Sequence, residues 1–212
     1  MVGFFITLFF FCFYSFAEPI VSISFNDAAL AHCVKTTAVE HHWQNSEQVI
    51  KLKCHGKGIK TVTDLIHFPQ LSYLSLFNNN ITTADLTALT QLSYVNLANN
   101  QLTTLTITNL ALLETLYVFK NQLTTIDFSG LTALKKLRAT NNRLNNLTIS
   151  PLISLKKAYF FDNKLKDLVV KGLPKLRFIE LRQNPMPDEV YDRYDELDGI
   201  TIVHDGNADD WK

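Results

Sequence analysis

The stretch LETLYVFKNQL, from Leu113 to Leu123, alternates apolar and other side chains and then reaches an asparagine. Leu116 and Val118 are two residues apart, the spacing that places side chains on the same face of a β-strand. Asn121 follows where the chain has to turn off that strand, and its amide can both donate and accept hydrogen bonds. An inward amide at this point would satisfy backbone groups that lack strand partners. The stretch therefore predicts a short strand with one buried face and a turn fixed by asparagine.

The same pattern recurs at intervals of 21 residues without a change of phase. The leucine that opens each unit is found at Leu71, Leu92, Leu113, Leu134, Leu155 and Leu176. The asparagine at the ninth position is found at Asn79, Asn100, Asn121, Asn142, Asn163 and Asn184. VIKLKCHGKGI, which starts at Val49, is a degenerate first unit with Lys57 in the asparagine position. A strict repeat of this length predicts a stack of similar coils, in which the asparagines form a ladder.

Each unit reads L-x-x-[LVAI]-x-[LVAF]-x-x-N-x-[ILM], and this motif resembles the leucine-rich repeat family, specifically its short bacterial repeats of the internalin-like sort. The resemblance covers Val49 to Met186. It implies an α/β solenoid that is mostly β, a horseshoe of 21-residue units with a parallel sheet on its concave face. The second half of each unit shows no sustained helical spacing, so we expect an extended or short-turn convex side.

A solenoid exposes its core at both ends unless terminal segments cover it. Before the repeats, residues 20–25 read as a strand, and Asn26 or Asp27 could cap a short helix through AALAHCV. Residues 18–48, which contain this arrangement, resemble the N-terminal caps that precede bacterial leucine-rich repeats. We therefore assign residues 18–48 to an N-terminal cap and residues 49–186 to the repeats.

The C-terminal segment, residues 187–212, is interpreted as a second cap with an acidic tail. Pro187 is expected at the first position of a helix through DEVYDRYDEL, whose first turn carries acidic residues. A turn at Gly199 then leads into a strand over residues 200–203. The oxygen-rich stretch 205–210 lacks the spacing and the terminal Glu of a calcium loop, so we interpret it as a disordered tail.

The first 17 residues, MVGFFITLFFFCFYSFA, contain no charged side chain and end in the small residues that signal peptidase accepts. We predict a cleaved secretory signal peptide over residues 1–17 and a secreted or periplasmic protein. An uncleaved anchor is the alternative, but the apolar stretch is shorter than the roughly 20 residues that span a bilayer, so we expect no stable membrane span after cleavage. In an exported chain, Cys33 and Cys54 are expected to form a disulfide that joins cap and repeats, with two buried free thiols as the alternative.

The net charge is zero, but the charges are segregated along the chain. Residues 134–182 hold 12 Lys and Arg against 3 Asp and Glu, a balance of +9. Residues 184–212 hold 9 acidic residues against 2 basic ones, a balance of −7. The sequence therefore predicts a molecule that is electrically polarised along its length.

The sequence contains no motif that indicates catalysis. A Gly-rich phosphate loop, G-x-S-x-G and H-E-x-x-H are all missing from it. His32, His41 and His42 do not have the spacing of metal ligands and are interpreted as solvated residues of the cap. Asn80 and Asn146 fit the glycosylation sequon, which is common by chance in a repeat rich in Thr and Asn. We expect no catalytic residues, no metal site and no cofactor.

The third, fifth and seventh positions of each unit are expected to face solvent on the concave side, because the fourth and sixth point into the core. These positions supply the candidate partner-binding residues, namely Tyr73, Tyr94, Tyr117, Phe119, Lys136, Arg138, Lys157, Tyr159, Phe161 and Phe178. Aromatic side chains in register form a patch that usually has a partner, and Tyr, Phe and Arg carry much of the energy of interfaces. For the row formed by Phe77, Phe119 and Phe161, the alternative is that the rings only seal the edge of the core.

These observations favour a non-catalytic, secreted or periplasmic module that recognises a protein partner through the concave face. A binder of carbohydrate or of an anionic polymer is the first alternative, since aromatic rings beside cations could stack sugars and pair with acidic groups. A second alternative is a solenoid that assembles with itself, the basic middle of one copy meeting the acidic tail of another. Export and the neutral overall charge disfavour nucleic acid as a partner.

Overall fold

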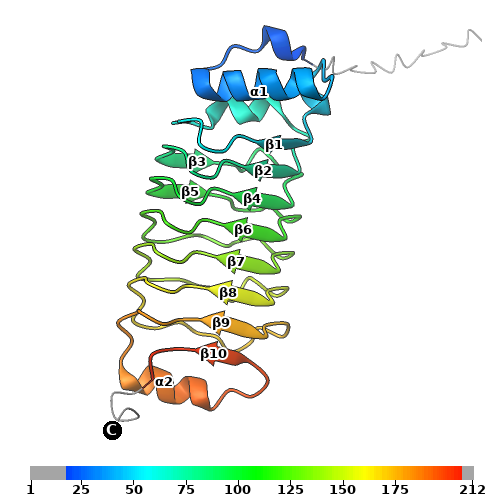
Figure 1. Ribbon diagram of the computed structural model, residues 1–212. Coiled ribbons are helices and arrows are strands. Elements are labelled where there is room, and N and C mark those ends of the chain that lie inside the picture. The colour runs from blue at the N-terminus through cyan, green and yellow to red at the C-terminus, as the bar shows by residue number, and fades with distance from the viewer. Residues whose placement is uncertain (1–17, 207–212) are drawn as a thin grey trace, which may run out of the picture.

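The computed structural model describes residues 18–206 of the chain. The predicted signal peptide, residues 1–17, and the end of the predicted acidic tail, residues 207–212, lie outside the described residues. Figure 1 shows a solenoid of stacked coils with strands along one side, helix α1 at the N-terminal end and helix α2 at the C-terminal end. The predicted fold class, a mostly β solenoid with a 21-residue period, is confirmed.

Within residues 18–206, eight strands form one sheet in which every pair is parallel. In spatial order the strands are β1 (Lys51–Lys53), β2 (Tyr73–Ser75), β4 (Tyr94–Asn96), β6 (Thr115–Tyr117), β7 (Lys136–Arg138), β8 (Lys157–Tyr159), β9 (Phe178–Glu180) and β10 (Thr201–Val203). From β2 to β9, each residue pairs with the residue 21 positions away, as Tyr73 does with Tyr94 and Tyr94 with Thr115. Residues at the same position of successive units therefore form columns that run across the sheet.

The opposite side of the solenoid contains little regular structure. It carries the 3₁₀ helix η3 (Thr63–His67) and a two-stranded parallel sheet of β3 (Thr83–Asp85) and β5 (Thr104–Thr106). Beyond these elements, the coils on this side run in turns and extended backbone (Figure 1). The expected extended or short-turn convex side is confirmed, and it follows from the Thr-rich, β-branched composition of these segments.

The core is continuous along the whole stack. In each unit the first, fourth and sixth positions are buried, as Leu71, Leu74 and Leu76 show in the coil of β2. Apolar side chains from the other side of the coil, such as Leu86 and Leu89, complete the filling. Because each coil covers the core of the next, only the two ends of the stack need additional protection.

The repeated asparagines bind the backbone of two successive coils. The Nδ2 atom of Asn163 donates to the carbonyl of Phe160 in its own coil (2.9 Å) and to that of Ala139 in the preceding coil (3.0 Å). Its Oδ1 atom accepts from the backbone N–H of Leu144, also in the preceding coil (3.1 Å). The same pattern is found at Asn79, Asn100, Asn121, Asn142 and Asn184. Each amide thus replaces the strand partners that the turning backbone has lost.

The residue before each ladder asparagine has a left-handed backbone conformation. This column consists of Asn78, Asn99, Lys120, Asn141, Asp162 and Gln183, whose φ angles lie between 54° and 59°. Gly56 holds the same place in the degenerate first unit, with φ 62°. Gly, Asn and Asp tolerate this conformation best, which explains why they fill most of the column.

The N-terminal cap differs from the sequence prediction at its start. Residues 20–25 do not form a strand, because the chain instead makes the 3₁₀ helix η1 (Ile20–Ser22) after Pro19. Ile20 and Ile23 are both buried, whereas Val21 between them is 83% exposed. Burial of residues three apart requires a helical turn, and a strand would have buried alternate residues.

Helix α1 (Ala28–Glu40) follows, and Asp27 is its N-cap. One carboxylate oxygen, Oδ1, accepts from the backbone N–H groups of Ala29 and Leu30, both at 2.9 Å. The other, Oδ2, accepts from the N–H groups of Lys60 (2.7 Å) and Thr61 (3.2 Å) in the first coil. A single buried carboxylate therefore ties the cap helix to the repeats.

This geometry predicts a pH-dependent contribution of Asp27 to stability. Burial raises the pKa of Asp27, but the four backbone N–H donors together lower it by more than burial raises it. The pKa therefore lies below its ordinary value. Because the folded pKa is below the unfolded one, the stabilisation is present above the unfolded pKa of about 3.9 and is lost as the pH falls through the folded pKa. We expect Asp27→Asn to lower the free energy of unfolding by about 1–3 kcal/mol at pH 7, since an amide group would face backbone donors.

The measurement is urea unfolding of the parent and of Asp27→Asn between pH 7 and pH 2. The difference between the two should shrink below about pH 4, where the Asp27 carboxylate begins to protonate in the unfolded parent. Asp198→Asn, at an exposed position, serves as the control and should match the parent throughout. A difference that stays constant over the whole pH range would contradict the prediction.

A disulfide joins α1 to the first coil. Cys33 lies on the buried face of α1, and Cys54 follows β1 directly rather than lying within the strand. The Cα atoms of the pair are 5.9 Å apart, and both residues are buried. The cap is therefore held on the array by a covalent bond in addition to the contacts of Asp27.

Helix α2 (Asp188–Asp195) covers the other end of the core. Pro187 is its N-cap rather than its first helical residue, because its ψ angle of 160° belongs to extended backbone. Tyr194 is buried, and its hydroxyl donates to the carbonyl of Leu168 in the last complete coil (2.8 Å). Strand β10 then pairs with β9 and ends the sheet.

Candidate recognition surface

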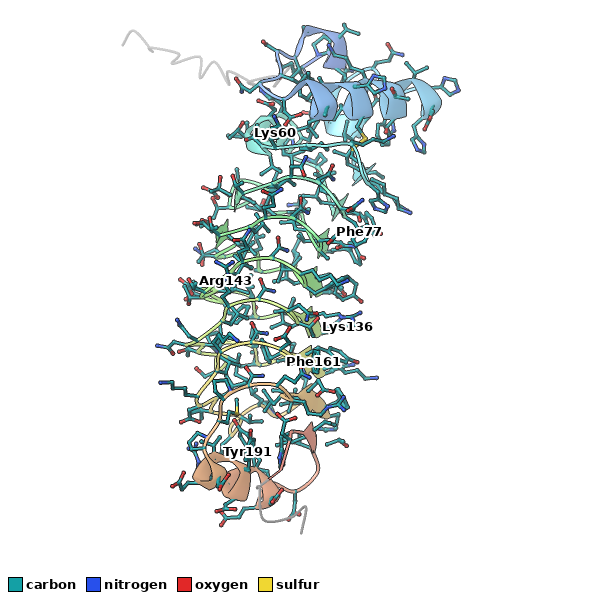
Figure 2. All side chains as sticks on the ribbon, turned by 60° about the vertical axis from the view of Figure 1, so that its left-hand side comes forward. Lys60, Phe77, Lys136, Arg143, Phe161 and Tyr191 are labelled. Carbon is teal, nitrogen blue, oxygen red and sulfur yellow. A yellow bond between two sulfur atoms is a disulfide. The ribbon has the colours of Figure 1, made fainter. Side chains whose placement is uncertain are left out.

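The outward side chains of the eight-stranded sheet form one surface, which we call the strand face. The third-position column contains Lys51, Tyr73, Tyr94, Thr115, Lys136, Lys157 and Phe178. The fifth-position column contains Lys53, Ser75, Asn96, Tyr117, Arg138, Tyr159 and Glu180. Figure 2 shows Phe77, Lys136 and Phe161 on this side of the array, with Lys60 and Arg143 toward the other side.

Three tyrosines at the N-terminal half of the strand face form a packed row, which we call the tyrosine strip: Tyr73, Tyr94 and Tyr117. The rings of Tyr73 and Tyr94 are stacked, with centroids 4.2 Å apart and planes inclined by 1°. Tyr117 meets Tyr94 edge to face at 5.8 Å. Burial raises the pKa of Tyr94 to about 12, with the hydroxyl of Tyr73 contributing further, so the phenol is neutral at physiological pH.

Cations lie over both ends of the tyrosine strip. At one end, the ammonium groups of Lys51 and Lys53 are 5.0 and 5.6 Å from the ring centre of Tyr73. At the other end, the ammonium group of Lys136 is 5.3 Å from the ring centre of Tyr117. The hydroxyl of Tyr117 raises the pKa of Lys136, which is therefore fully charged at neutral pH. Cation–π contacts of this length restrict the side chains without removing their charge.

Lys51 and Lys53 were not among the residues that the sequence pattern selected. They belong to the degenerate first unit, VIKLKCHGKGI, which lacks the ladder asparagine. The structure nevertheless pairs β1 with β2 in the register of the other repeats. The signal that could have identified them is their place at the third and fifth positions of this unit, the positions of Tyr73 and Ser75 in the next one. The spacing between the two units is one residue longer than the repeat.

The C-terminal half of the strand face brings together most of the remaining candidates. Tyr117, Arg138 and Tyr159 lie side by side on neighbouring strands, as do Lys136 and Lys157. Two further ring contacts are present on this part of the surface. The guanidinium of Arg138 is 4.5 Å from the ring centre of Phe119, and the rings of Tyr159 and Phe178 are 5.3 Å apart.

The seventh-position phenylalanines lie at the ends of the strands and are half-buried. Phe77, Phe119 and Phe161 alternate with the small, buried residues Ala98 and Thr140. The rings of Phe77 and Phe119 approach to 6.4 Å across Ala98. The row therefore covers the edge of the core and keeps part of each ring accessible. This arrangement is compatible both with partner binding and with a role that only seals the edge of the core.

Two fifth-position residues that were expected to face solvent are buried. Ser75 is 2% exposed, and its hydroxyl lies 2.7 Å from the Nε2 atom of His55. Glu180 is 9% exposed, and its carboxylate accepts from the guanidinium of Arg182 at 2.8 and 3.0 Å. Both polar groups are engaged by a neighbouring side chain, which a period-two rule does not anticipate.

Other parts of residues 18–206 offer less to a ligand. No group of three or more His, Cys, Asp or Glu side chains in this range is placed to hold a metal ion. His41 stacks on Trp43, with ring centres 4.7 Å apart. Among the described residues, no helix has the length and apolar character needed to cross a membrane.

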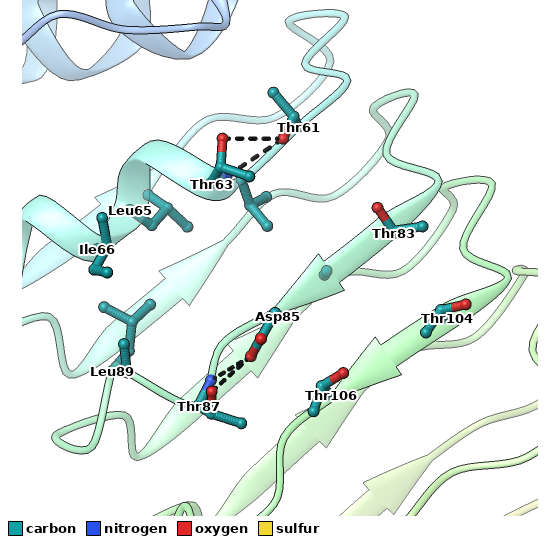
Figure 3. Close-up of a pocket in the computed structure, with 13 residues that line it drawn as sticks. Thr61, Thr63, Leu65, Ile66, Thr83, Asp85, Thr87, Leu89, Thr104 and Thr106 are labelled. Atoms are coloured by element: carbon teal, nitrogen blue, oxygen red, sulfur yellow. Dashed lines mark hydrogen bonds between the residues drawn. The ribbon is translucent and has the colours of Figure 1, made fainter.

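A groove of about 470 Å³ lies on the side opposite the strand face, between η3 and the sheet of β3 and β5 (Figure 3). Threonine hydroxyls such as those of Thr83 and Thr104 line it, together with apolar side chains such as Ile66. Its carboxylate, Asp85, accepts from the hydroxyl (2.7 Å) and the backbone N–H (3.0 Å) of Thr87, and these bonds lower the pKa of Asp85. The carboxylate is thus engaged within its own turn rather than directed at a ligand.

Comparison with solved structures identifies proteins of similar fold. No family model and no curated protein sequence match the chain. Among solved structures, an internalin C2 from Listeria monocytogenes is 26% identical, with a TM-score of 0.56, over 89% of this chain and 97% of that one. An internalin (inlF) from the same species is 19% identical, with a TM-score of 0.57, over 91% and 67% of the two chains.

A third solved structure, TLR13 in a complex with ssRNA13, is 23% identical, with a TM-score of 0.57. The match covers 73% of this chain but only 24% of the TLR13 chain, so it spans about a quarter of that protein. At this level of identity the likeness concerns the fold alone. Taken with the 21-residue period and the parallel solenoid, these neighbours show that the chain has the leucine-rich repeat fold of the internalins.

Proposed function

We propose that the chain is a secreted or periplasmic, non-catalytic module that recognises another protein through the strand face. The observation that carries this proposal is the packed array of rings and cations from Lys51 to Phe178. Tyr and Arg side chains contribute much of the binding energy at protein interfaces. Here ring stacking and cation–π contacts already restrict them, so less conformational entropy is lost when a partner binds.

Export is part of the same proposal. The disulfide between Cys33 and Cys54 supports it, because such bonds persist in oxidising compartments. The predicted signal peptide over residues 1–17 supplies the route. In this interpretation the mature module consists of the N-terminal cap (18–48), the repeats (49–186) and the C-terminal cap with its tail (187–212).

The ring contacts favour a protein over a neutral carbohydrate. Sugars bind aromatic side chains by stacking on open ring faces. The faces of Tyr73 are covered by Lys51, Lys53 and Tyr94, and Lys136 covers Tyr117. The strip therefore presents ring edges and hydroxyl groups, which suit the mixed apolar and polar surface of a protein.

A cross-linking capture experiment tests the proposal. The mature chain is compared with the strand-face variant Tyr117→Ser, Arg138→Glu, Lys157→Glu in extracts of the producing cell and of any host. A matched control, Thr125→Ser, Arg143→Glu, Lys166→Glu, makes the same charge change at exposed positions outside the strand face. Circular dichroism and thermal unfolding establish that both variants are folded.

We expect a protein that the parent and the control capture and that the strand-face variant loses at least tenfold. A tenfold loss of affinity corresponds to about 1.4 kcal/mol of binding free energy, and the substitution of two contacting side chains is sufficient for a loss of this size. Equal capture by all three proteins would exclude the strand face as the binding surface. Loss in the control but not in the strand-face variant would move the site to the opposite side.

A further inference from the structure

Two pairs of cations lie on either side of the tyrosine strip. Lys51 and Lys53 form the first pair on β1, and Lys136 and Arg138 form the second pair on β7. All four side chains are exposed, and none belongs to a salt bridge among residues 18–206. Their charges are therefore held in place by aromatic rings and remain available to a ligand.

The distance between the two pairs follows from the order of the strands. From β1 to β7 the sheet passes through β2, β4 and β6, which makes four steps between neighbouring strands. At about 4.8 Å for each step, the two strands that carry the pairs are about 19 Å apart. An extended peptide rises about 3.3 Å per residue, so about six residues of peptide span this distance.

The surface between the pairs has a different chemistry. It carries the tyrosine strip, flanked by the hydroxyl groups of Ser72 and Ser93 and by Thr115. Glu114, whose backbone carbonyl accepts from the N–H of Lys136, has its carboxylate paired with Lys135 at 2.6 Å. Positive charge is thus concentrated at two places and separated by a strip of ring edges and hydroxyls.

We propose that the strand face binds an extended acidic segment of a protein partner that lies across the strands. Carboxylates of this segment meet the two cation pairs, and a short run of small or apolar residues between them covers the tyrosine strip. A uniformly charged polymer fits this pattern less well, because its central charges would lie over Tyr94, the one ring of the strip over which no cation lies among residues 18–206. The inference rests on the proposed function, since it specifies the partner of the same surface.

Synthetic peptides test the spacing directly. The probe is the fluorescent, end-blocked peptide DDVSVSDD, in which the two acidic pairs are separated by four residues. One control, DDDDVSVS, has the same composition with the acids together, and the other, NNVSVSNN, has no charge. Binding is measured by fluorescence anisotropy at low and at physiological ionic strength.

We expect DDVSVSDD to bind at least tenfold more tightly than either control peptide, with the advantage reduced by salt. Lys51→Gln with Lys53→Gln, and separately Lys136→Gln with Arg138→Gln, should each weaken binding of DDVSVSDD about tenfold. The control Arg143→Gln with Lys166→Gln removes the same charge elsewhere and should leave binding unchanged. Equal binding of the split and clustered peptides, or of the charged and uncharged ones, would overturn the inference.

The outcome is separable from that of the capture experiment. If a partner is captured through the strand face but DDVSVSDD does not bind, the acidic segment is wrong and the recognition function stands. If DDVSVSDD binds through both cation pairs but no protein is captured, the spacing is right and the assignment of a protein partner fails. Concentration-dependent sedimentation of the parent that both double variants abolish would assign the surface to a second copy of this chain instead.

Discussion

Asn163→Ala is expected to lower the free energy of unfolding by about 3 kcal/mol, because it leaves the buried N–H of Leu144 without a partner, at roughly 1–3 kcal/mol, and removes hydrogen bonds to two buried carbonyls at about 0.5–1.5 kcal/mol each. The amide of Asn163 is 1% exposed, so water cannot take its place. The carbonyls of Ala139 and Phe160 each lose one bond and keep another, from Asn142 and Asn184 respectively. Leu144 and Ala139 belong to the preceding coil, so the substitution weakens the contact between coils as well as the turn itself.

The measurement is urea unfolding followed by circular dichroism. Asn145→Ala is the matched control, since Asn145 is an exposed residue of the preceding coil. Surface substitutions of this kind change stability by about 0.5 kcal/mol or less. Equal midpoints for the two variants would show that the ladder amides do not stabilise the array.

Loss of the disulfide is the second large effect that we expect. Cys33→Ala with Cys54→Ala should lower the free energy of unfolding by about 3 kcal/mol, because the bond closes a loop of 21 residues and restricts the unfolded chain. The same bond holds α1 over the first coil, whose core residues Leu52 and Ile59 are fully buried. Without it, the helix is expected to separate from the array at lower urea concentration than the repeats unfold.

Reductant provides a test that needs no mutation. The parent in reductant should unfold at the same urea concentration as the double alanine variant, and the variant should not respond to reductant. With Trp211 replaced by Phe, tryptophan fluorescence can follow the cap, because Trp43 packs against the core there. A parent whose unfolding midpoint is unchanged after both thiols have been shown to be free would contradict the prediction.

The repeats could be predicted because two simple requirements recur in every unit. A buried strand face needs apolar residues at the fourth and sixth positions, as in Leu74 and Leu76. A tight turn needs its backbone satisfied, and Asn79 supplies the amide. Each signal is weak in a single unit but is reinforced by repetition at a fixed spacing. The cap has no such repetition. The strand predicted over residues 20–25 is wrong, because only the burial of both Ile20 and Ile23 distinguishes a helical turn from a strand here.

The candidate surface could be predicted in composition but not in geometry. Alternation identifies Tyr73, Tyr94 and Tyr117 as outward residues, and the structure places all three on the strand face. The sequence does not show that Tyr73 and Tyr94 stack on each other rather than offer open faces. It also passes over Lys51 and Lys53, because a degenerate unit gives no reason to trust its register. These features depend on side-chain rotamers and on neighbours, which periodicity does not encode.

The uniform register of the sheet makes the array a molecular ruler. From β2 to β9, every strand step joins residues 21 positions apart, and every ladder amide binds only its own coil and the preceding one. Insertion or deletion of one whole unit would therefore preserve each pairing and each turn. It would change the separation of two outward groups by one strand spacing, about 4.8 Å. Duplication of repeats in such a gene is a way to fit a longer or shorter ligand without the invention of a new fold.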